Sequence, residues 1–420
     1  MDEVLCIQII ESLRKGIPPQ RGIDLYSVGN EKLIEGVKRH HLNQIEAMGI
    51  IRFISGSWGA GKTHLFRLLR EVAFQNNCLV SNVELNVNDV PFNKFEEVFY
   101  AIVRNIATPS FFKKGALAAA PFGWVVQESL SYLGTGNRSV SHVSYEDYTK
   151  ACESLMSDQS IDIDFKKMIQ KYWETFLPEA ADKTVQGQTR AEILQWFSGK
   201  GTVGQYRRRF GVNTMVSRSN AKLMLQSLSG FIRLSGYRGL LILFDEAEQS
   251  YSNMRNAQLR GAHNNLLALI NGIDDPLSRG LFLIYATTPD FYTDSRHGII
   301  INGALSGRIG QPNQRKPRAL DIVWNFDEVD TDLSVYQVAA KKIQDIYVAA
   351  YPEAGSGLPS EKQLGDFVRE LYTIHPSLSA LRFWRVMVTS LITHFDDFLE
   401  GEIRPTQELY DDVMDRLREA

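Results

Sequence analysis

The sequence predicts an α/β fold in which a parallel sheet lies between layers of helices, and three observations point to it. Short apolar runs alternate with segments of helical periodicity, one interval between two of these runs is long and helical, and the last part of the chain has no strand-like run. Strands that alternate with helices are typical of three-layer α/β sheets, whose strands are buried on both faces.

Five apolar runs have the length and composition of buried parallel strands. They are Ile50–Ser55, Leu79–Leu85, Leu240–Phe244, Leu281–Ala286 and Leu320–Trp324. Helical patterns such as His64–Phe74 and Arg260–Ile270 lie between them. We therefore expect a parallel five-stranded sheet.

The interval between the second and third runs is too long for a loop without secondary structure. Since much of it has helical periodicity, we expect a large helical insertion at about residues 105–235. Residues 334–420 also have helical periodicity, with breaks at Pro352–Pro359, Pro376 and Pro405. The expected organisation is a core over residues 1–333, which includes the insertion, followed by a small helical lid domain over 334–420.

Composition excludes several classes of protein. The 420-residue chain has 46 Lys and Arg against 49 Asp and Glu, and this net charge of −3 excludes a uniformly basic nucleic-acid coat protein. Its three cysteines lack the spacing of a disulfide scaffold or a zinc site. No apolar run approaches the length of about 18 residues that a membrane span needs. Because Asp2 and Glu3 precede the first apolar residues, the N-terminus is unlike a secretory signal, and we expect a cytoplasmic protein with no membrane contact.

The most specific motif is GSWGAGKT at residues 56–63, which matches the phosphate-loop pattern GxxxxGK[ST] between a predicted strand and a predicted helix. Its glycines permit close backbone approach, and its N–H groups and the helix N-terminus attract phosphate oxygens. Lys62 places a charge on the β- and γ-phosphates, and Thr63 offers a hydroxyl to Mg²⁺. We therefore predict that ATP and Mg²⁺ bind here. The expected nucleotide-binding residues are Gly56, Ser57, Trp58, Gly59, Ala60, Gly61, Lys62, Thr63 and His64.

Two carboxylates follow the third predicted strand in the sequence GLLILFDE. Ligands of open α/β sheets bind at the carboxyl ends of the strands, where this pair lies. We expect Asp245 to hold Mg²⁺ together with Thr63, and Glu246 to polarise the attacking water as general base. The alternative is a solvated acidic turn, since Glu248 follows, but the phosphate loop favours the catalytic interpretation.

Thr287 and Thr288 end the next predicted strand, again at the nucleotide edge of the sheet. A hydroxyl there is suited to hold the attacking water against the γ-phosphate. The alternative is that both cap the turn before Pro289, and the sequence does not separate the two threonines.

Two arginines are candidates for action on the phosphates. Arg308 lies between the fourth and fifth predicted strands, in a region that faces the neighbouring subunit in ring ATPases, and an arginine donated across an interface stabilises transition-state charge. We therefore expect a homo-oligomer that forms with ATP. Arg382 begins a helix of the lid and is suited to reach the γ-phosphate; Arg385, one turn later, is the alternative, and ordinary helix-surface charge is the structural explanation for both.

Arg207, Arg208 and Arg209 lie between Tyr206 and Phe210. Basic residues with interleaved aromatic residues are found in nucleic-acid interfaces, although a short run is more often a solvated face. We therefore expect a solvated or protein-docking face here, with direct contact with DNA as the alternative.

The order of several sequence blocks resembles one family. These blocks are IIESLRKGIPPQRGIDLYSVGNEKLI, GSWGAGKTHLFRLLRE, GYRGLLILFDEAEQ and ATTPDFYTDSRHGIIINGALSGRI. Together they resemble the BREX-system ATP-binding proteins of the BrxD type, which are AAA+ P-loop ATPases of bacterial anti-phage defence. The resemblance implies an AAA+ core, an N-terminal segment near the adenine, a helical lid and a nucleic-acid-handling partner such as a helicase.

The function that we expect is an AAA+ ATPase that hydrolyses Mg-ATP to remodel or load a nucleic-acid-processing partner. One alternative is a nucleotide-switched scaffold that hydrolyses ATP slowly and uses the helical insertion for docking. A P-loop kinase is a further alternative, but a kinase does not need a water-activating glutamate beside the metal-binding aspartate.

Overall fold

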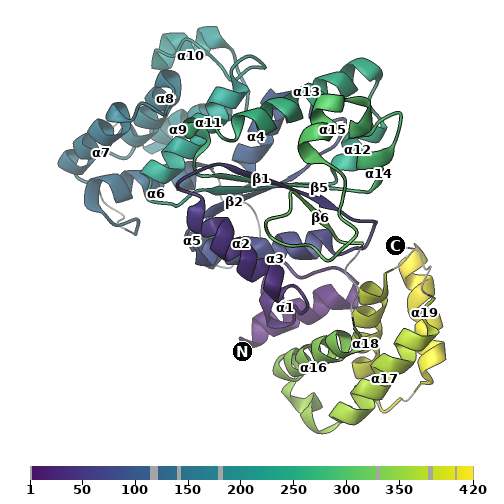
Figure 1. Ribbon diagram of the computed structural model, residues 1–420. Helices are drawn as coiled ribbons and strands as arrows, with labels where there is room; N and C mark the ends of the chain where they lie inside the picture. The colour runs from purple at the N-terminus through teal and green to yellow at the C-terminus, as the bar shows by residue number, and fades with distance from the viewer. Residues whose placement is uncertain are drawn as a thin grey trace.

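The computed structural model describes residues 2–113, 122–139, 143–177, 183–327, 332–376, 382–402 and 404–419. Within them the chain forms a mixed α/β fold around a six-stranded sheet in the order β3-β2-β4-β5-β1-β6 (Figure 1). The strands are β1 Ile50–Ser55, β2 Leu79–Glu84, β3 Ile106–Ala107, β4 Leu240–Asp245, β5 Leu281–Thr287 and β6 Val323–Asn325. All paired neighbours are parallel except β2 and β3, which are antiparallel.

The expected count of five strands was wrong by one edge strand. β3 consists of only two residues, Ile106 and Ala107, and lies shortly after a helix that ends at Arg104. Two residues carry no periodicity, and their strand pairing depends on the tertiary contact with Val80 and Ser81. The other five strands lie where the apolar runs predicted them, with ends shifted by up to three residues.

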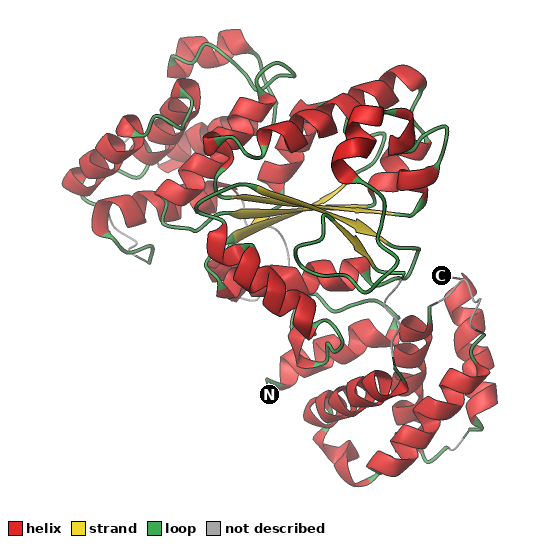
Figure 2. Ribbon diagram, viewed as in Figure 1, coloured by secondary structure: helices red, strands yellow, loops and turns green. Residues whose placement is uncertain are grey.

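Side chains on the two faces of the sheet belong to two different hydrophobic clusters. In β4, Leu240, Ile242 and Phe244 belong to one cluster, whereas Leu241 and Leu243 belong to the other. Successive residues of a strand point to opposite faces, so this alternation shows that helices cover the sheet on both sides (Figure 2).

The long interval between β2 and β4 consists mainly of helices, most of which lie against one face of the sheet (Figure 1). Its helices are α4 Phe95–Arg104, α5 Pro109–Lys113, α6 Phe122–Thr135, α7 Tyr145–Ser157, α8 Ile163–Glu174, α9 Lys183–Phe197, α10 Val203–Phe210 and α11 Ala221–Leu234. The short helix α5 lies on the other side, where Phe112 contacts Phe74 of the helix that follows the phosphate loop. The buried side chains of Trp173, Trp196 and Phe231 belong to the same cluster as Ile242 and Tyr285 of the sheet. The insertion therefore shares its core with the sheet.

Six further helices among the described residues complete the two layers. α12 Ala247–Ser252, α13 Asn256–Gly272, α14 Asp290–Thr293 and α15 Gly303–Ile309 lie on the same face as the insertion, and α2 Glu31–His40 and α3 Lys62–Gln75 lie on the other. In the part of the chain that the structure describes, no helix has the length and apolarity needed to cross a membrane.

The C-terminal part of the chain is a separate group of helices at the lower right of Figure 1. They are α16 Leu333–Ala350, α17 Glu361–Ile374, α18 Phe383–Glu400 and α19 Thr406–Glu419. α16, α17 and α19 end or begin next to Pro352, Pro376 and Pro405, as the proline breaks predicted.

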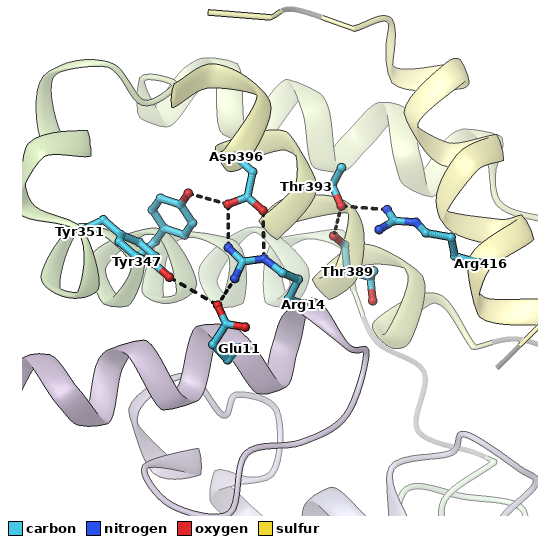
Figure 3. A network of polar contacts seen from close by, with 8 residues as sticks. All are labelled: Glu11, Arg14, Tyr347, Tyr351, Thr389, Thr393, Asp396 and Arg416. Atoms are coloured by element: carbon cyan, nitrogen blue, oxygen red, sulfur yellow. Dashed lines mark hydrogen bonds and ion pairs between the residues drawn. The ribbon is translucent and has the colours of Figure 1, made fainter. Parts of the chain in front are cut away.

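Helix α1, Glu3–Arg14, packs against these C-terminal helices, although the sequence-based division assigned it to the core. Arg14 donates two hydrogen bonds to Asp396, from Nε at 3.0 Å and from Nη2 at 2.8 Å, and Tyr347 donates to the same carboxylate at 2.7 Å (Figure 3). Arg14 also pairs with Glu11. Burial is the largest influence on the pKa of Arg14 and lowers it, but the hydrogen bonds and charge of Asp396 together with Tyr351 and Glu11 exceed that effect and raise the pKa. This network joins the N-terminus to α16 and α18.

Candidate nucleotide-binding site

The glycine-rich loop joins β1 to α3 at the carboxyl edge of the sheet. Gly59 and Gly61 have φ angles of 77° and 92°, in the left-handed region that residues with a Cβ rarely adopt. Gly61 caps the N-terminus of α3 without a side-chain hydrogen bond. The first N–H groups of a helix have no partner within the helix, so this end of α3 offers partial positive charge to an anion.

Lys62 is folded across the loop. Its Nζ donates to Gly56 O at 2.6 Å and to Ser57 O at 3.4 Å, and the residue is 9% exposed. Burial lowers the pKa of Lys62, while the nearby carboxylates of Glu248 and Asp245 oppose that shift. A buried ammonium held by two carbonyl oxygens is a charge that a phosphate can recruit.

Thr63 and Asp245 come together from α3 and the end of β4. Thr63 Oγ1 donates to Asp245 Oδ2 at 3.3 Å, and the backbone N–H of Glu246 donates to Asp245 Oδ1 at 3.0 Å. Burial raises the pKa of Asp245. A hydroxyl beside a carboxylate at the phosphate loop is the donor set that Mg²⁺ uses in nucleotide sites, where phosphates and water supply the other ligands.

Glu246 adopts a left-handed backbone conformation, with φ of 53°. This conformation is uncommon for residues other than glycine, and such strain is concentrated at functional sites. Burial, followed by the charges of Asp245 and Glu84, raises the pKa of Glu246 and so makes its carboxylate a stronger base. The turn directs this residue out of the strand that carries Asp245.

The structure places the two threonines of β5 differently. Thr287 is fully buried, and its hydroxyl donates to Ile54 O at 2.9 Å and bonds the Tyr292 hydroxyl at 3.2 Å. Thr288 lines an open pocket of about 450 Å³ beside the phosphate loop. Because β5 lies between β1 and β4, Thr288 lies between the phosphate loop and Asp245 at the end of β4.

Glu248 also lines this pocket, and the sequence had indicated only a solvated acidic turn there. Its Oε2 is buried and has no hydrogen-bond partner among the described residues, and burial raises the pKa of Glu248. The pocket lies between the loop and the segment after β5. Its lining residues are Ser57, Trp58, Glu248, Tyr251, Thr288, Pro289, Asp290, Phe291, Asp294, His297 and Gly298. The acidic run DEAE was the available sequence signal, but it does not show which carboxylate is buried.

The structure distinguishes the two arginines of the C-terminal helices. Arg382 caps α18 and lies against the phosphate loop, where a Cβ on Gly59 would be 3.4 Å from Arg382 Cγ. Its guanidinium pairs with Asp327 at 2.5 Å. Arg385 lies instead beside Gly16, at the end of α1. Asp327 follows β6 and was missed by the sequence interpretation, because an isolated aspartate after a strand carries no motif.

Arg308 lies in the last turn of α15, outside the site of its own chain. It is exposed, and its Nη1 makes a long contact of 3.5 Å to Ala304 O. An exposed guanidinium at this position is available to another molecule. Its expected role across a subunit interface stays a prediction.

His64 faces the N-terminal segment. Its Nε2 bonds Ser27 Oγ at 3.0 Å, and its ring packs edge-on against Tyr26. Burial lowers the pKa of His64 to about 4, so the ring is neutral at pH 7. Lys342 of α16 donates to Ser27 O at 3.2 Å. The segment at Ser27 thus contacts both the helix after the phosphate loop and the C-terminal helices.

The aromatic residues beside the arginine run in α10 belong to the core. Tyr206 and Phe210 are 4% and 7% exposed and belong to the hydrophobic cluster of the insertion. Arg209 pairs locally with Glu192 at 2.5 Å. Neither ring is available to stack on a base in this conformation, so the arginine run lacks the aromatic partners that had suggested nucleic-acid contact.

The strand, glycine-rich loop and helix, with Lys62 and Thr63 at the helix start and Asp245 on a neighbouring strand, define a P-loop nucleotide-binding protein. The family described as BREX system ATP-binding protein BrxC/D matches residues 4–412. The chain belongs to this family, whose description assigns it an ATP-binding role in BREX defence. No curated protein and no solved structure matches the chain.

Proposed function

We propose that the protein is an AAA+-type ATPase that binds Mg-ATP at the phosphate loop and hydrolyses it. In this proposal Lys62 and the loop N–H groups bind the phosphates, and Thr63 and Asp245 hold Mg²⁺. Magnesium, when bound there, would offset the negative charge of the phosphates. The BREX ATP-binding family supports nucleotide binding, and the site supports the chemistry.

One observation carries the hydrolytic part of the proposal. Asp245 and Glu246 are consecutive, yet the left-handed turn at Glu246 separates their tasks, because Asp245 bonds Thr63 while Glu246 leaves the strand. Glu246 would accept a proton from water as the water oxygen bonds the γ-phosphorus and the bond to ADP breaks. Thr288, at the pocket beside the loop, would orient that water.

Assembly and partner are further parts of the proposal. Arg308 would stabilise charge on the nucleotide of a neighbouring subunit, so that ATP promotes a homo-oligomer. Its exposure on α15 supports this role. The ATP cycle would remodel or load a nucleic-acid-processing partner, such as a helicase, in anti-phage defence. Contact with DNA would then occur mainly through the partner, because the aromatic residues of α10 are buried.

Lys62→Ala tests nucleotide binding. At a ligand concentration of 100 times Kd, binding adds about 2.7 kcal/mol of stability. With an unfolding entropy of about 2.1 cal/mol/K per residue, the 420 residues give a rise in Tm of about 3 °C with Mg-ATP. We expect this rise in the wild type and not in Lys62→Ala. Lys341→Ala is the matched control, since Lys341 pairs with Asp345 in α16, and it should keep the rise. An equal rise in all three proteins would refute the site.

The alternative is a nucleotide-switched scaffold with slow turnover. The contacts of Arg382 with Asp327 and of Lys342 with Ser27 favour it, because they link the nucleotide site to the C-terminal helices. Glu246→Gln separates the two functions. If hydrolysis drives the cycle, this variant should keep ATP binding and lose turnover by about 10²–10⁴-fold in a steady-state phosphate-release assay. A wild-type rate as low as that of the variant would support the scaffold.

A further inference from the structure

Asp327 joins the phosphate loop to the C-terminal helices. Both of its carboxylate oxygens lie 3.0 Å from the backbone N–H of Ser57, which donates to them. The same carboxylate accepts from Arg382 Nη2 at 2.5 Å. One side chain therefore contacts both the second residue of the loop and the arginine that caps α18.

The backbone around Asp327 is fixed to the base of the loop. The N–H of Phe326 donates to Ser55 O at 2.8 Å, which continues the pairing of β6 with β1. The N–H of Asp327 donates to Asn325 Oδ1 at 3.1 Å, and Asn325 Nδ2 donates to Asn313 O at 2.8 Å. The backbone at Asp327 is thus hydrogen-bonded to the sheet, whereas Arg382 belongs to a different group of helices and reaches Asp327 through its side chain.

The pair between Asp327 and Arg382 is suited to exchange. Their side chains are 22% and 42% exposed, and partly solvated ion pairs are weak. A guanidinium binds phosphate in the same bidentate geometry as it binds carboxylate, and a phosphate carries more charge. Arg382 already lies against Gly59, within the loop that receives the phosphates.

We propose that Asp327 holds Arg382 when the site lacks a γ-phosphate and releases it to the γ-phosphate of ATP, so that this pair reduces the preference of the site for ATP over ADP. The proposal rests on the nucleotide site proposed above. Binding of ATP then includes the loss of the Asp327–Arg382 pair, whereas binding of ADP leaves it intact. Asp327 is a positioning residue, because it acts on the nucleotide through Arg382.

Asp327→Asn tests the proposal, because the amide oxygen still accepts from Ser57 N–H while the negative charge is lost. Affinities for ADP and for a non-hydrolysable ATP analogue are measured by titration calorimetry, and their ratio is the readout. We expect the ratio to shift toward the ATP analogue by about twofold to fivefold, the range that partly exposed ion pairs give. Using the ratio cancels the part of the electrostatic gain that both nucleotides share.

Two controls make the test specific. Asp321→Asn removes a carboxylate from the same region, where Asp321 pairs with Arg315, and should leave the ratio unchanged. In an Arg382→Ala background, Asp327→Asn should also leave it unchanged, because the partner is gone. An unchanged or lower ratio in Asp327→Asn, or the same shift without Arg382, would overturn the proposal. Failure of the wild type to bind either nucleotide would instead refute the nucleotide site.

Discussion

Replacing Thr287 and Thr288 by valine, one at a time, separates a structural hydroxyl from one that faces the pocket. Valine keeps the shape of threonine and removes the hydroxyl. At Thr287 this change removes the hydrogen bond to Ile54 O and one contact of the Tyr292 hydroxyl, and both Thr287 and Tyr292 are 0% exposed. Loss of a buried hydrogen-bond partner costs about 1–3 kcal/mol. If the chain unfolds as one unit, an unfolding entropy of about 2.1 cal/mol/K for each of 420 residues makes this a fall in Tm of about 1–3 °C.

Thr288→Val should have the opposite profile. Thr288 lines the pocket, so its hydroxyl contributes little to folding, and we expect a change in stability within about 0.5 kcal/mol. Turnover should fall by about 10- to 100-fold, because a misplaced water reacts slowly. Calorimetric melting and steady-state phosphate release measure the two effects, with Thr293→Val in α14 as an exposed control. The reasoning is refuted if Thr287→Val melts like the wild type but loses hydrolysis, or if Thr288→Val hydrolyses ATP at the wild-type rate.

Three other substitutions test assembly, pH dependence and the contact of α1. Arg308→Ala should keep ATP binding and lose about 10³–10⁵ in turnover, and mixing it with Lys62→Ala should restore part of the phosphate release; no recovery and a monomeric mass in ATP would exclude action across an interface. Burial, with a smaller effect of Arg52, lowers the pKa of His41 from 6.5 to about 4. The neutral ring therefore stabilises the fold above pH 6.5. This stabilisation, roughly 3 kcal/mol, is lost as the pH falls toward 4. His41→Gln should therefore lose less stability than the wild type between pH 7 and 4.5 in urea melts, and an identical loss would contradict this. Arg14→Ala should lower the free energy of unfolding by about 1–3 kcal/mol. The control Arg369→Ala removes an exposed pair with Asp366 and should cost less than about 1 kcal/mol. Equal losses would show that the network in Figure 3 adds nothing to stability.

The sequence predicted the features that depend on local pattern. The central strands are apolar runs because both faces of the sheet are buried, and Gly59 and Gly61 of the GSWGAGKT loop are needed for their left-handed backbone conformation. β3 was missed because Ile106 and Ala107 show no local pattern and form a strand only through pairing with β2. The arginines of α10 suggested contact with nucleic acid, although the buried Tyr206 and Phe210 determine how this helix packs.

Site residues that belong to a sequence motif could be predicted. Residues whose role depends on a tertiary contact could not. Thr287 and Thr288 are equivalent in sequence, and only the position of Tyr292 shows which hydroxyl is engaged in the core. Glu248 and Asp327 are ordinary acidic residues in the sequence. The structure singles out Glu248 because one of its carboxylate oxygens is buried, and Asp327 because it contacts both the phosphate loop and Arg382.

Two contacts join the C-terminal helices to other parts of the chain, one to α1 and one to the phosphate loop, and they differ in how easily they exchange. Arg14 of α1 donates two hydrogen bonds to Asp396 of α18, whose carboxylate also accepts from Tyr347 of α16, so separating α1 from α18 requires the loss of both Arg14 bonds together. The contact of Arg382 with Asp327 is a single, partly exposed pair beside the loop. A ligand shifts a conformational equilibrium only by its differential interaction with the two states. Of the two contacts, only the pair of Arg382 lies where a phosphate can replace its partner, so a response of the C-terminal helices to nucleotide should begin there, with α1 moving together with them.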